Sequence, residues 1–272
     1  MARAQTQWEY LRFLIDCIGL FQAFRVRLSM IASRLRLMNF ETTWLRHPKL
    51  ERKVLARLAS TDFVVFRQVL MEEQYSVVGN IAPEIIVDCG ANVGYTSAYF
   101  LTLFPKCRVI AIEPLRSNFD ICRSNLAYYG SRAKVVHAAV WSHCGRLTTD
   151  HKAGNEWGFD VRSARPGETA DIPAIDLPSL GLERIDLLKI DIECSEIELF
   201  SHGADRWLPT VRNIVIELHN DECAHAFFHA LDDYSCDTHN SGELTICCNI
   251  RPKDQLTAPT DSQTPSESDR CA

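Results

Sequence analysis

The sequence predicts an α/β fold in which a mainly parallel sheet is covered by helices on both faces. Between residues 85 and 218, short runs of apolar residues alternate with amphipathic stretches of helical length. This alternation is typical of repeated strand–helix–strand units. The first of these strands runs directly into a turn that contains Gly90 and Gly94. A glycine turn at the carboxyl end of a parallel strand commonly binds a nucleotide.

The composition is that of a globular protein. The chain has 272 residues, of which 46% are hydrophobic and 24% charged, with a formal net charge of -6. We expect no nucleic-acid partner, because nucleic-acid binders usually carry a basic excess. The 11 cysteines include no C-x-x-C pair and no zinc-ligand spacing, so reduced thiols in a cytoplasmic protein are expected, with disulfides as the alternative.

Residues 1–60 are predicted to form a helical extension, because Val54, Leu55 and Leu58 recur at three- and four-residue steps. Residues 11–24 are apolar, but this run is too short and too interrupted by polar residues to span a membrane. Seven arginines and three acidic residues lie between Met1 and Arg46. This basic segment either contacts an anionic membrane surface as a peripheral helix or packs against the catalytic domain or a partner.

Residues 61–251 are predicted to form the main domain, which begins with a helix near Phe63 after a Ser60-Thr61-Asp62 cap. The strands that we expect are 85–87, 108–112, 134–140, 185–192, 213–218, 234–238 and 244–249. The helices that we expect are 95–103, 116–129, one opening at 196–201, and 222–231. Residues 141–180 are rich in glycine and proline and are expected to form a hairpin and loops over the site. Residues 252–272 are expected to be a disordered tail.

The turn from Asp88 to Gly94 carries the clearest chemical signal. Gly90 and Gly94 allow the backbone to turn sharply and to approach a ligand. Glu113 ends the next strand, 19 residues after Gly94. A carboxylate at this place can accept hydrogen bonds from the hydroxyl groups of a ribose. Asn92 occupies the place of the middle glycine that a dinucleotide pyrophosphate requires. An adenosine ligand without phosphates, S-adenosylmethionine, therefore fits this turn better than NAD does.

These motifs resemble those of the FkbM family of methyltransferases, within the class I Rossmann-like superfamily. The matching segments are 87–94, 111–114 with Asn118, 186–193 and 214–219. The resemblance implies a Rossmann-like three-layer sandwich with a seven-stranded sheet whose last strand is antiparallel. It also implies methyl transfer from S-adenosylmethionine, usually to an oxygen of a small molecule or a sugar-containing product.

The resemblance also implies roles for individual residues in binding the cofactor. The residues expected to line the methionine part of S-adenosylmethionine are Asp88, Gly90, Asn92 and Gly94. Glu113 is expected to hold the ribose. The residues expected near the adenine are Asn118, Ala139 and Val140.

Candidates for the acceptor chemistry lie at the ends of the fourth and fifth strands. Asp191 and Glu193 project to the same side if the chain is still extended there. His219 titrates in the range that suits a general base, although it could instead hydrogen-bond a neighbouring loop. Asp191 could instead form a salt bridge with Lys189 or Arg184. Asp191, Glu193 and His219 also offer suitable ligand atoms for a metal, but the Asp-Asn pair of catechol-type enzymes is missing, and we expect no metal.

Two other functions remain open. A nicotinamide-dependent oxidoreductase is disfavoured by Asn92 and by the lack of a Tyr-x-x-x-Lys pair. A catalytically inactive binding or scaffold protein is favoured by Cys194, where the family generally has glycine, and by the short region after Leu231. We expect a methyltransferase that acts on a small-molecule or glycan acceptor.

Overall fold

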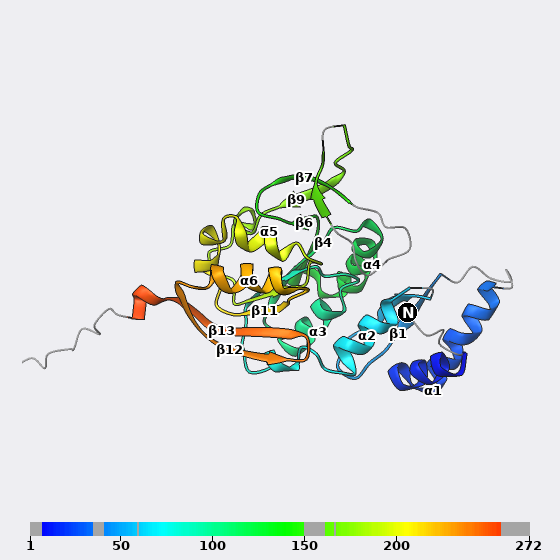
Figure 1. Ribbon diagram of the computed structural model, residues 1–272. Coiled ribbons are helices and arrows are strands. Elements are labelled where there is room, and N and C mark those ends of the chain that lie inside the picture. The colour runs from blue at the N-terminus through cyan, green and yellow to red at the C-terminus, as the bar shows by residue number, and fades with distance from the viewer. Residues whose placement is uncertain (1–6, 35–40, 59, 150–160, 166, 257–272) are drawn as a thin grey trace, which may run out of the picture.

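A seven-stranded sheet with the order β12-β13-β11-β10-β3-β4-β5 forms the centre of the protein (Figure 1). The structure is a computed structural model and describes residues 7–34, 41–58, 60–149, 161–165 and 167–256. The strands of this sheet are β3 (Ile85–Cys89), β4 (Arg108–Glu113), β5 (Ala133–His137), β10 (Leu187–Ile190), β11 (Ile214–Glu217), β12 (Tyr234–Ser241) and β13 (Leu244–Pro252). Strands β5, β4, β3, β10 and β11 run parallel, and β13 is antiparallel to β11. The predicted sheet is confirmed.

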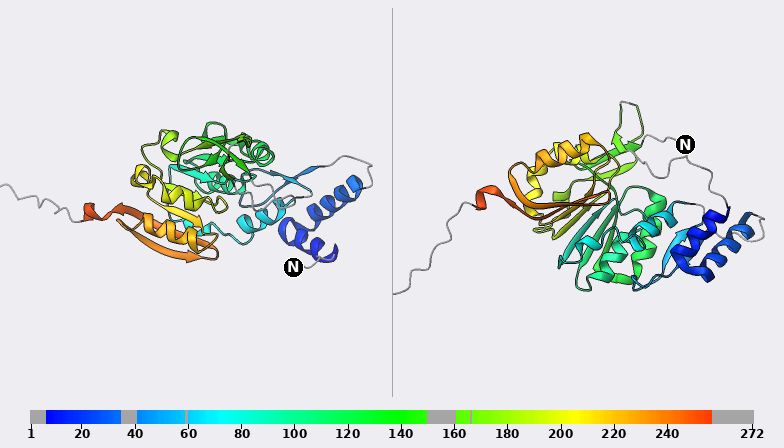
Figure 2. Two further views of the ribbon diagram at one scale, coloured as in Figure 1. Left: turned by 45° about the horizontal axis from the view of Figure 1, so that its top comes forward. Right: turned by 60° about the horizontal axis from the view of Figure 1, so that its bottom comes forward.

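Helices cover both faces of this sheet, which lies between them in Figure 2. One layer contains α2 (Asp62–Leu70), α3 (Tyr95–Leu103) and α4 (Arg116–Leu126), and the other contains α5 (Glu196–Ser201) and α6 (Asp221–Ala230). Ile86 and Val87 are neighbours on β3, yet Ile86 packs in the core with α3 and Val87 in the core with α6. Because successive side chains of a strand point to opposite faces, β3 is apolar on both sides. The predicted three-layer sandwich is confirmed.

The helical prediction for residues 1–60 is correct for α1 (Gln7–Arg34) and wrong for residues 42–57. There, β1 (Thr42–Leu45) and β2 (Val54–Arg57) form an antiparallel pair. Val54 and Ala56 are buried while Leu55 is less so, which is the two-residue period of a strand. Hydrogen bonds to distant residues hold the strand: the Leu55 amide donates to Asn125 Oδ1 (2.5 Å).

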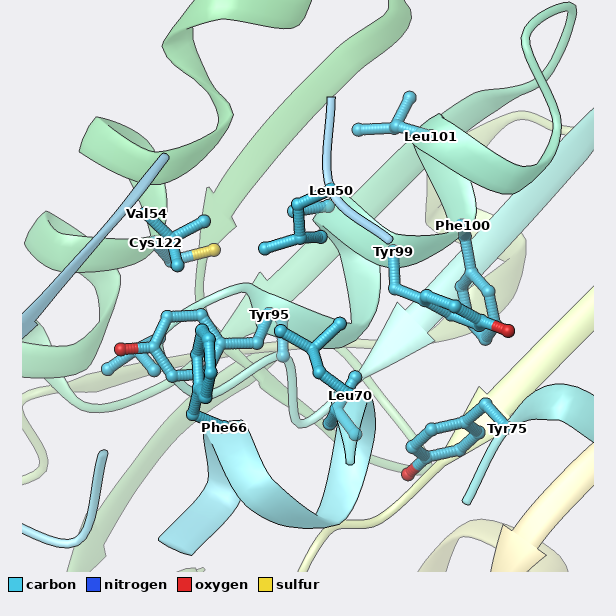
Figure 3. Packing of buried hydrophobic residues seen from close by; sticks show 14 of the residues in the cluster. Leu50, Val54, Phe66, Leu70, Tyr75, Tyr95, Tyr99, Phe100, Leu101 and Cys122 are labelled. Carbon is cyan, nitrogen blue, oxygen red and sulfur yellow. The ribbon is translucent and has the colours of Figure 1, made fainter. Parts of the chain in front are cut away.

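The core between α2 and α3 is rich in aromatic residues (Figure 3). Phe66 of α2 meets Tyr95 of α3 edge to face, with ring centroids 5.6 Å apart, and Tyr75 meets Phe100 in the same way at 5.7 Å. Helix α2 begins at Asp62, close to the predicted start, although Thr61 makes no capping hydrogen bond with its side chain. This packing fixes α2 beside the carboxyl end of β3.

The irregular segment after residue 138 forms a second, four-stranded sheet. Its strands are β6 (Ala139–Val140), β7 (Gly145–Thr149), β8 (Val161–Ser163) and β9 (Ile172–Ile175), in the order β6-β9-β7-β8. The predicted third strand, 134–140, is therefore divided between β5 and β6. The expected hairpin is formed by β7 and β8, and residues 150–160 between them lie outside the described residues. The disordered tail expected for 252–272 is wrong at its start, because Pro252 ends β13 and Lys253–Leu256 form a short 3-10 helix. Residues 257–272 lie outside the described residues.

The region after Leu231 is long enough to finish the main sheet, contrary to expectation. Strands β12 and β13 have 8 and 9 residues and pair along most of their length. Eight cysteines are free thiols, namely Cys89, Cys107, Cys122, Cys144, Cys223, Cys236, Cys247 and Cys248. Among the helices that the structure describes, none is long and apolar enough to cross a membrane.

Candidate active site

The loop after β3 is pressed against the ends of two neighbouring strands. Gly90 has φ +77°, and a Cβ atom built there would lie 1.8 Å from the carbonyl oxygen of Asp191. The Gly90 and Ala91 amides both donate to the Ile112 carbonyl at 3.0 Å. Only glycine combines this backbone angle with so close an approach.

Glu113 ties this loop to the end of β4. Its Oε2 accepts a hydrogen bond from the Asn92 amide (2.8 Å), and its Oε1 accepts one from the Leu115 amide (2.9 Å). The side chain is buried, and burial raises the pKa of Glu113 to about 7, although these hydrogen bonds act to lower it. A buried carboxylate therefore lies beside the glycine turn, as the sequence predicts.

A cavity opens between this loop, Glu113 and the second sheet, and we call it the Glu113 cavity. Among the predicted site residues, it is lined by Gly90, Asn92, Glu113, Asn118, Ala139, Val140, Asp191 and Glu193. Val161 of β8 also lines it, so the irregular segment reaches the site as expected. The structure thus brings most of the predicted cofactor residues to one cavity.

A second cavity, which we call the α2 cavity, lies between α2 and the same loop. It shares Gly90, Asn92, Asp191 and Glu193 with the Glu113 cavity, so the two cavities meet at the loop. Polar side chains missed by the sequence analysis also line it, namely Thr61, Gln68, Gln74 and Thr96. No local signal could identify Gln68, because polar residues occur on the outer face of most amphipathic helices. Gln74 lies in the turn after α2, where polar residues are equally common.

Asp88 and Gly94 lie beneath the loop and line neither cavity, so their contact with the ligand stays a prediction. Asp88 is fully buried, and the Ser97 hydroxyl donates to its Oδ2 at 2.6 Å. A Cβ atom at Gly94 would lie 2.8 Å from Cys122 Sγ, so this glycine allows α3 to pack closely on α4. Both residues support the loop from below.

Lys189 is the buried partner of Asp88, and the sequence analysis considered it only as a partner of Asp191. Its Nζ donates to the Gly90 carbonyl (2.7 Å) and lies 3.2 Å from Asp88 Oδ1 and 3.4 Å from Asp191 Oδ2. Burial alone would lower the pKa of Lys189, but the carboxylates of Asp88 and Asp191 outweigh it and raise that pKa well above its usual value. The sequence did contain a signal for a buried lysine, because Lys189 is the one charged residue in the apolar run 187–190.

Asn118 connects the Glu113 cavity to the N-terminal hairpin. Its Oδ1 accepts a hydrogen bond from Arg57 Nη2 (2.8 Å), and its Nδ2 lies 3.4 Å from Glu113 Oε1. The same Arg57 nitrogen forms a salt bridge of 2.7 Å with buried Asp62 at the start of α2. Residues of β2 and α2 therefore hold one wall of the cavity.

Asp191, Glu193 and His219 come together at the ends of β10 and β11. His219 Nε2 lies 3.5 Å from Glu193 Oε2 and 3.7 Å from Asp191 Oδ1, while its Nδ1 lies 3.3 Å from Glu196 Oε1. The Glu196 carboxylate, 3.3 Å from Nδ1, raises the pKa of His219 to about 9. His219 is therefore an imidazolium at neutral pH and, in that state, cannot accept a proton.

Glu193 is better suited to accept a proton. Burial raises its pKa to about 7, against the lowering effect of His219. The ligand atoms of Asp191, Glu193 and His219 lie within 4.8 Å of one another, so they could hold a divalent cation. The His219 imidazolium forms ion pairs with both Asp191 and Glu193.

Cys194 lies in the left-handed backbone region, with φ +68°. In the folded protein, a residue with a Cβ atom is strained by about 1–2 kcal/mol in this region. Glycine avoids this strain, but its greater freedom in the unfolded chain lowers the free energy of unfolding by about 0.5–1 kcal/mol. We therefore expect Cys194→Gly to raise the free energy of unfolding by about 0.5–1 kcal/mol, measured by urea denaturation. Cys194→Ala is the matched control because it removes the thiol but keeps the Cβ atom. Equal stabilisation by both variants would show that the thiol, not the backbone, is responsible.

Comparisons with known proteins identify one family profile and several similar proteins. The sequence profile of the methyltransferase FkbM domain matches residues 88–238. AMB antimetabolite synthetase AmbE of Pseudomonas aeruginosa is 32% identical over 80 residues, which are 29% of this chain and 4% of that protein. Methyltransferase sdnD of Sordaria araneosa is 27% identical over 85 residues, which are 30% of this chain and 33% of that protein. This chain thus matches only a minor part of either relative's length.

Solved structures of methyltransferases are also similar to this chain. Methyltransferase FkbM from Methylobacillus flagellatus KT has a TM-score of 0.46 and 18% identity, covering 69% of this chain and 53% of that one. A methyltransferase from Geobacter sulfurreducens has a TM-score of 0.45 and 16% identity, covering 83% of this chain and 96% of that one.

Proposed function

Because this chain belongs to the FkbM methyltransferase family, we propose that it transfers the methyl group of S-adenosylmethionine to an oxygen atom of a small-molecule or sugar-containing acceptor. One observation carries this proposal: the close-packed glycine loop, buried Glu113 and the Asp191/Glu193 carboxylates surround the same cavity. The residues suited to cofactor binding and those suited to proton removal therefore line the same cavity.

The residues around the Glu113 cavity fit an adenosine. The Glu113 carboxylate can accept hydrogen bonds from both ribose hydroxyls. Ala139 and Val140 offer an apolar wall for the adenine, and the bare backbone at Gly90 lets the ligand lie against the loop. The polar α2 cavity, with Gln68 and Gln74, suits the amino-acid end of the cofactor.

The strand-end cluster supplies what an oxygen acceptor needs. When bound, S-adenosylmethionine supplies a methyl group on a positively charged sulfur. The site must hold the acceptor hydroxyl in line at about 3 Å and remove its proton. Glu193, with its pKa raised to about 7, accepts this proton as the oxygen–carbon bond forms and the carbon–sulfur bond breaks. His219 positions Glu193 and Asp191 through their ion pairs.

We expect Glu113→Gln to weaken S-adenosylhomocysteine binding by about tenfold or more, because a hydrogen bond to a charged group contributes about 1.5–3 kcal/mol. Isothermal titration calorimetry measures the dissociation constant. Glu84→Gln, an exposed position just before β3, is the matched control and should bind like the wild type. Normal binding by Glu113→Gln would remove Glu113 from the site. Binding of NAD instead would favour the oxidoreductase, and no binding of adenosyl compounds would favour the scaffold protein.

The acceptor class is tested separately with methyl-labelled S-adenosylmethionine and a panel of hydroxyl-bearing small molecules and glycans. Glu193→Gln should lower methyl transfer far more than it weakens S-adenosylhomocysteine binding, which it can affect because Glu193 lines both cavities. Transfer to nitrogen or carbon acceptors alone would overturn the oxygen specificity and keep the methyltransferase activity.

A further inference from the structure

The second half of α1 carries a row of exposed apolar side chains. After Gly19, which has φ +76° and interrupts the helix, the exposed fractions are 69% for Leu20, 76% for Phe21, 60% for Phe24, 50% for Leu28 and 46% for Ile31. At 3.6 residues per turn, these five positions fall within an arc of about 100°. We call these five residues the α1 stripe.

The opposite face of α1 is already used for packing. Ala23 and Val26, with Leu14 and Ile18 before the interruption, belong to the same core as Phe66 of α2. Figures 1 and 2 show α1 at the outside of the molecule, beyond α2 and away from the main sheet. The packing role expected from the sequence therefore accounts for one face of α1 and leaves the stripe without a role.

Arginines lie beside both edges of the α1 stripe. On the same helical projection, Arg25 lies about 40° beyond one edge and Arg27 about 20° beyond the other. Residues 20–31 contain no acidic residue. An apolar stripe flanked by arginines, whose long stems keep the charge at the water boundary, fits the interface of an anionic bilayer.

We propose that the α1 stripe docks this protein on an anionic lipid surface, with the helix lying in the plane of the interface. A second copy of the chain is a poorer occupant. Pairing two stripes would bring Arg25 of both copies to the same rim, and residues 20–31 contain no acidic residue.

Co-sedimentation of the full chain with vesicles tests this proposal. We expect binding to vesicles of phosphatidylcholine with 30% phosphatidylserine, weak binding to phosphatidylcholine alone, and loss of binding as salt increases. The double variant Phe21→Glu/Phe24→Glu should lose at least tenfold in partitioning. Phe228→Glu is the matched control, because Phe228 is an exposed phenylalanine (45%) on α6 and should bind like the wild type.

A second pair of variants tests the charge. Arg25→Glu should reduce binding to the anionic vesicles several-fold. Arg251→Glu, at an exposed position of β13, should not reduce it. S-adenosylhomocysteine binding by each variant reports that the domain is folded. The proposal is overturned if the double phenylalanine variant sediments like the wild type. It is also overturned if vesicles are not bound while sedimentation velocity shows a dimer that the double variant abolishes.

Discussion

Asp88→Ala is expected to lower the free energy of unfolding by about 3–5 kcal/mol, because it removes one partner of a buried ion pair and leaves the other charged. Asp88 is fully buried, and Lys189 Nζ lies 3.2 Å from its Oδ1. The same lysine holds the Gly90 carbonyl at 2.7 Å. Loss of Asp88 therefore weakens the support of the glycine loop as well as the core.

Urea denaturation followed by circular dichroism measures this change. Asp120→Ala is the control, because Asp120 forms an ion pair with Arg116 on the exposed surface of α4, and exposed pairs contribute little to stability. If Asp88 contacts the ligand, as its position at a strand end suggests, the variant would lose S-adenosylhomocysteine affinity at unchanged stability. That result would contradict a supporting role.

Gly90→Ala is expected to abolish S-adenosylhomocysteine binding and to destabilise the protein more than other glycine substitutions do. An alanine with φ +77° is strained by about 1–2 kcal/mol. The new methyl group would also lie 1.8 Å from the Asp191 carbonyl oxygen, and overpacking of this kind costs about 1–3 kcal/mol more. The loop must move away from β10 to relieve the contact, and it then leaves its place beside Glu113.

Gly181→Ala separates these two effects. Gly181 has φ +66°, but a Cβ atom there meets nothing within 4 Å. Its variant should show the backbone strain alone and bind S-adenosylhomocysteine normally. Equal losses of stability in the Gly90 and Gly181 variants, measured by urea denaturation, would show that the contact with Asp191 is relieved without cost.

The sheet and the glycine loop could be predicted because their signals are local. Ile85 to Val87 reads as a buried strand, and the glycines follow it directly. The β1–β2 hairpin could not be predicted in this way, because the spacing of Val54, Leu55 and Leu58 fits both the helical period of 3.6 residues and the strand period of two. What decides between them is a hydrogen bond from Leu55 to Asn125, 70 residues away.

The position of Asp88 depends on the order of the strands. Lys189 is directly opposite Asp88 in the β10–β3 register, and that pairing joins residues that are 101 positions apart in the chain. The protonation of His219 likewise depends on Glu196, a buried residue at the start of α5. Sequence spacing identifies which residues end strands, but not which side chains face one another across strands and helices.

The contact of Arg57 with Asn118 makes the N-terminal hairpin part of the ligand's surroundings. Binding equilibria are reciprocal, so any ligand that is held better when β2 and α2 are in place also holds them in place. The segments that precede residue 88 lie outside the stretch that matches the family profile. The residues that shape the cavity therefore begin well before residue 88, because Arg57 of β2 holds Asn118 and Asn118 lies beside Glu113.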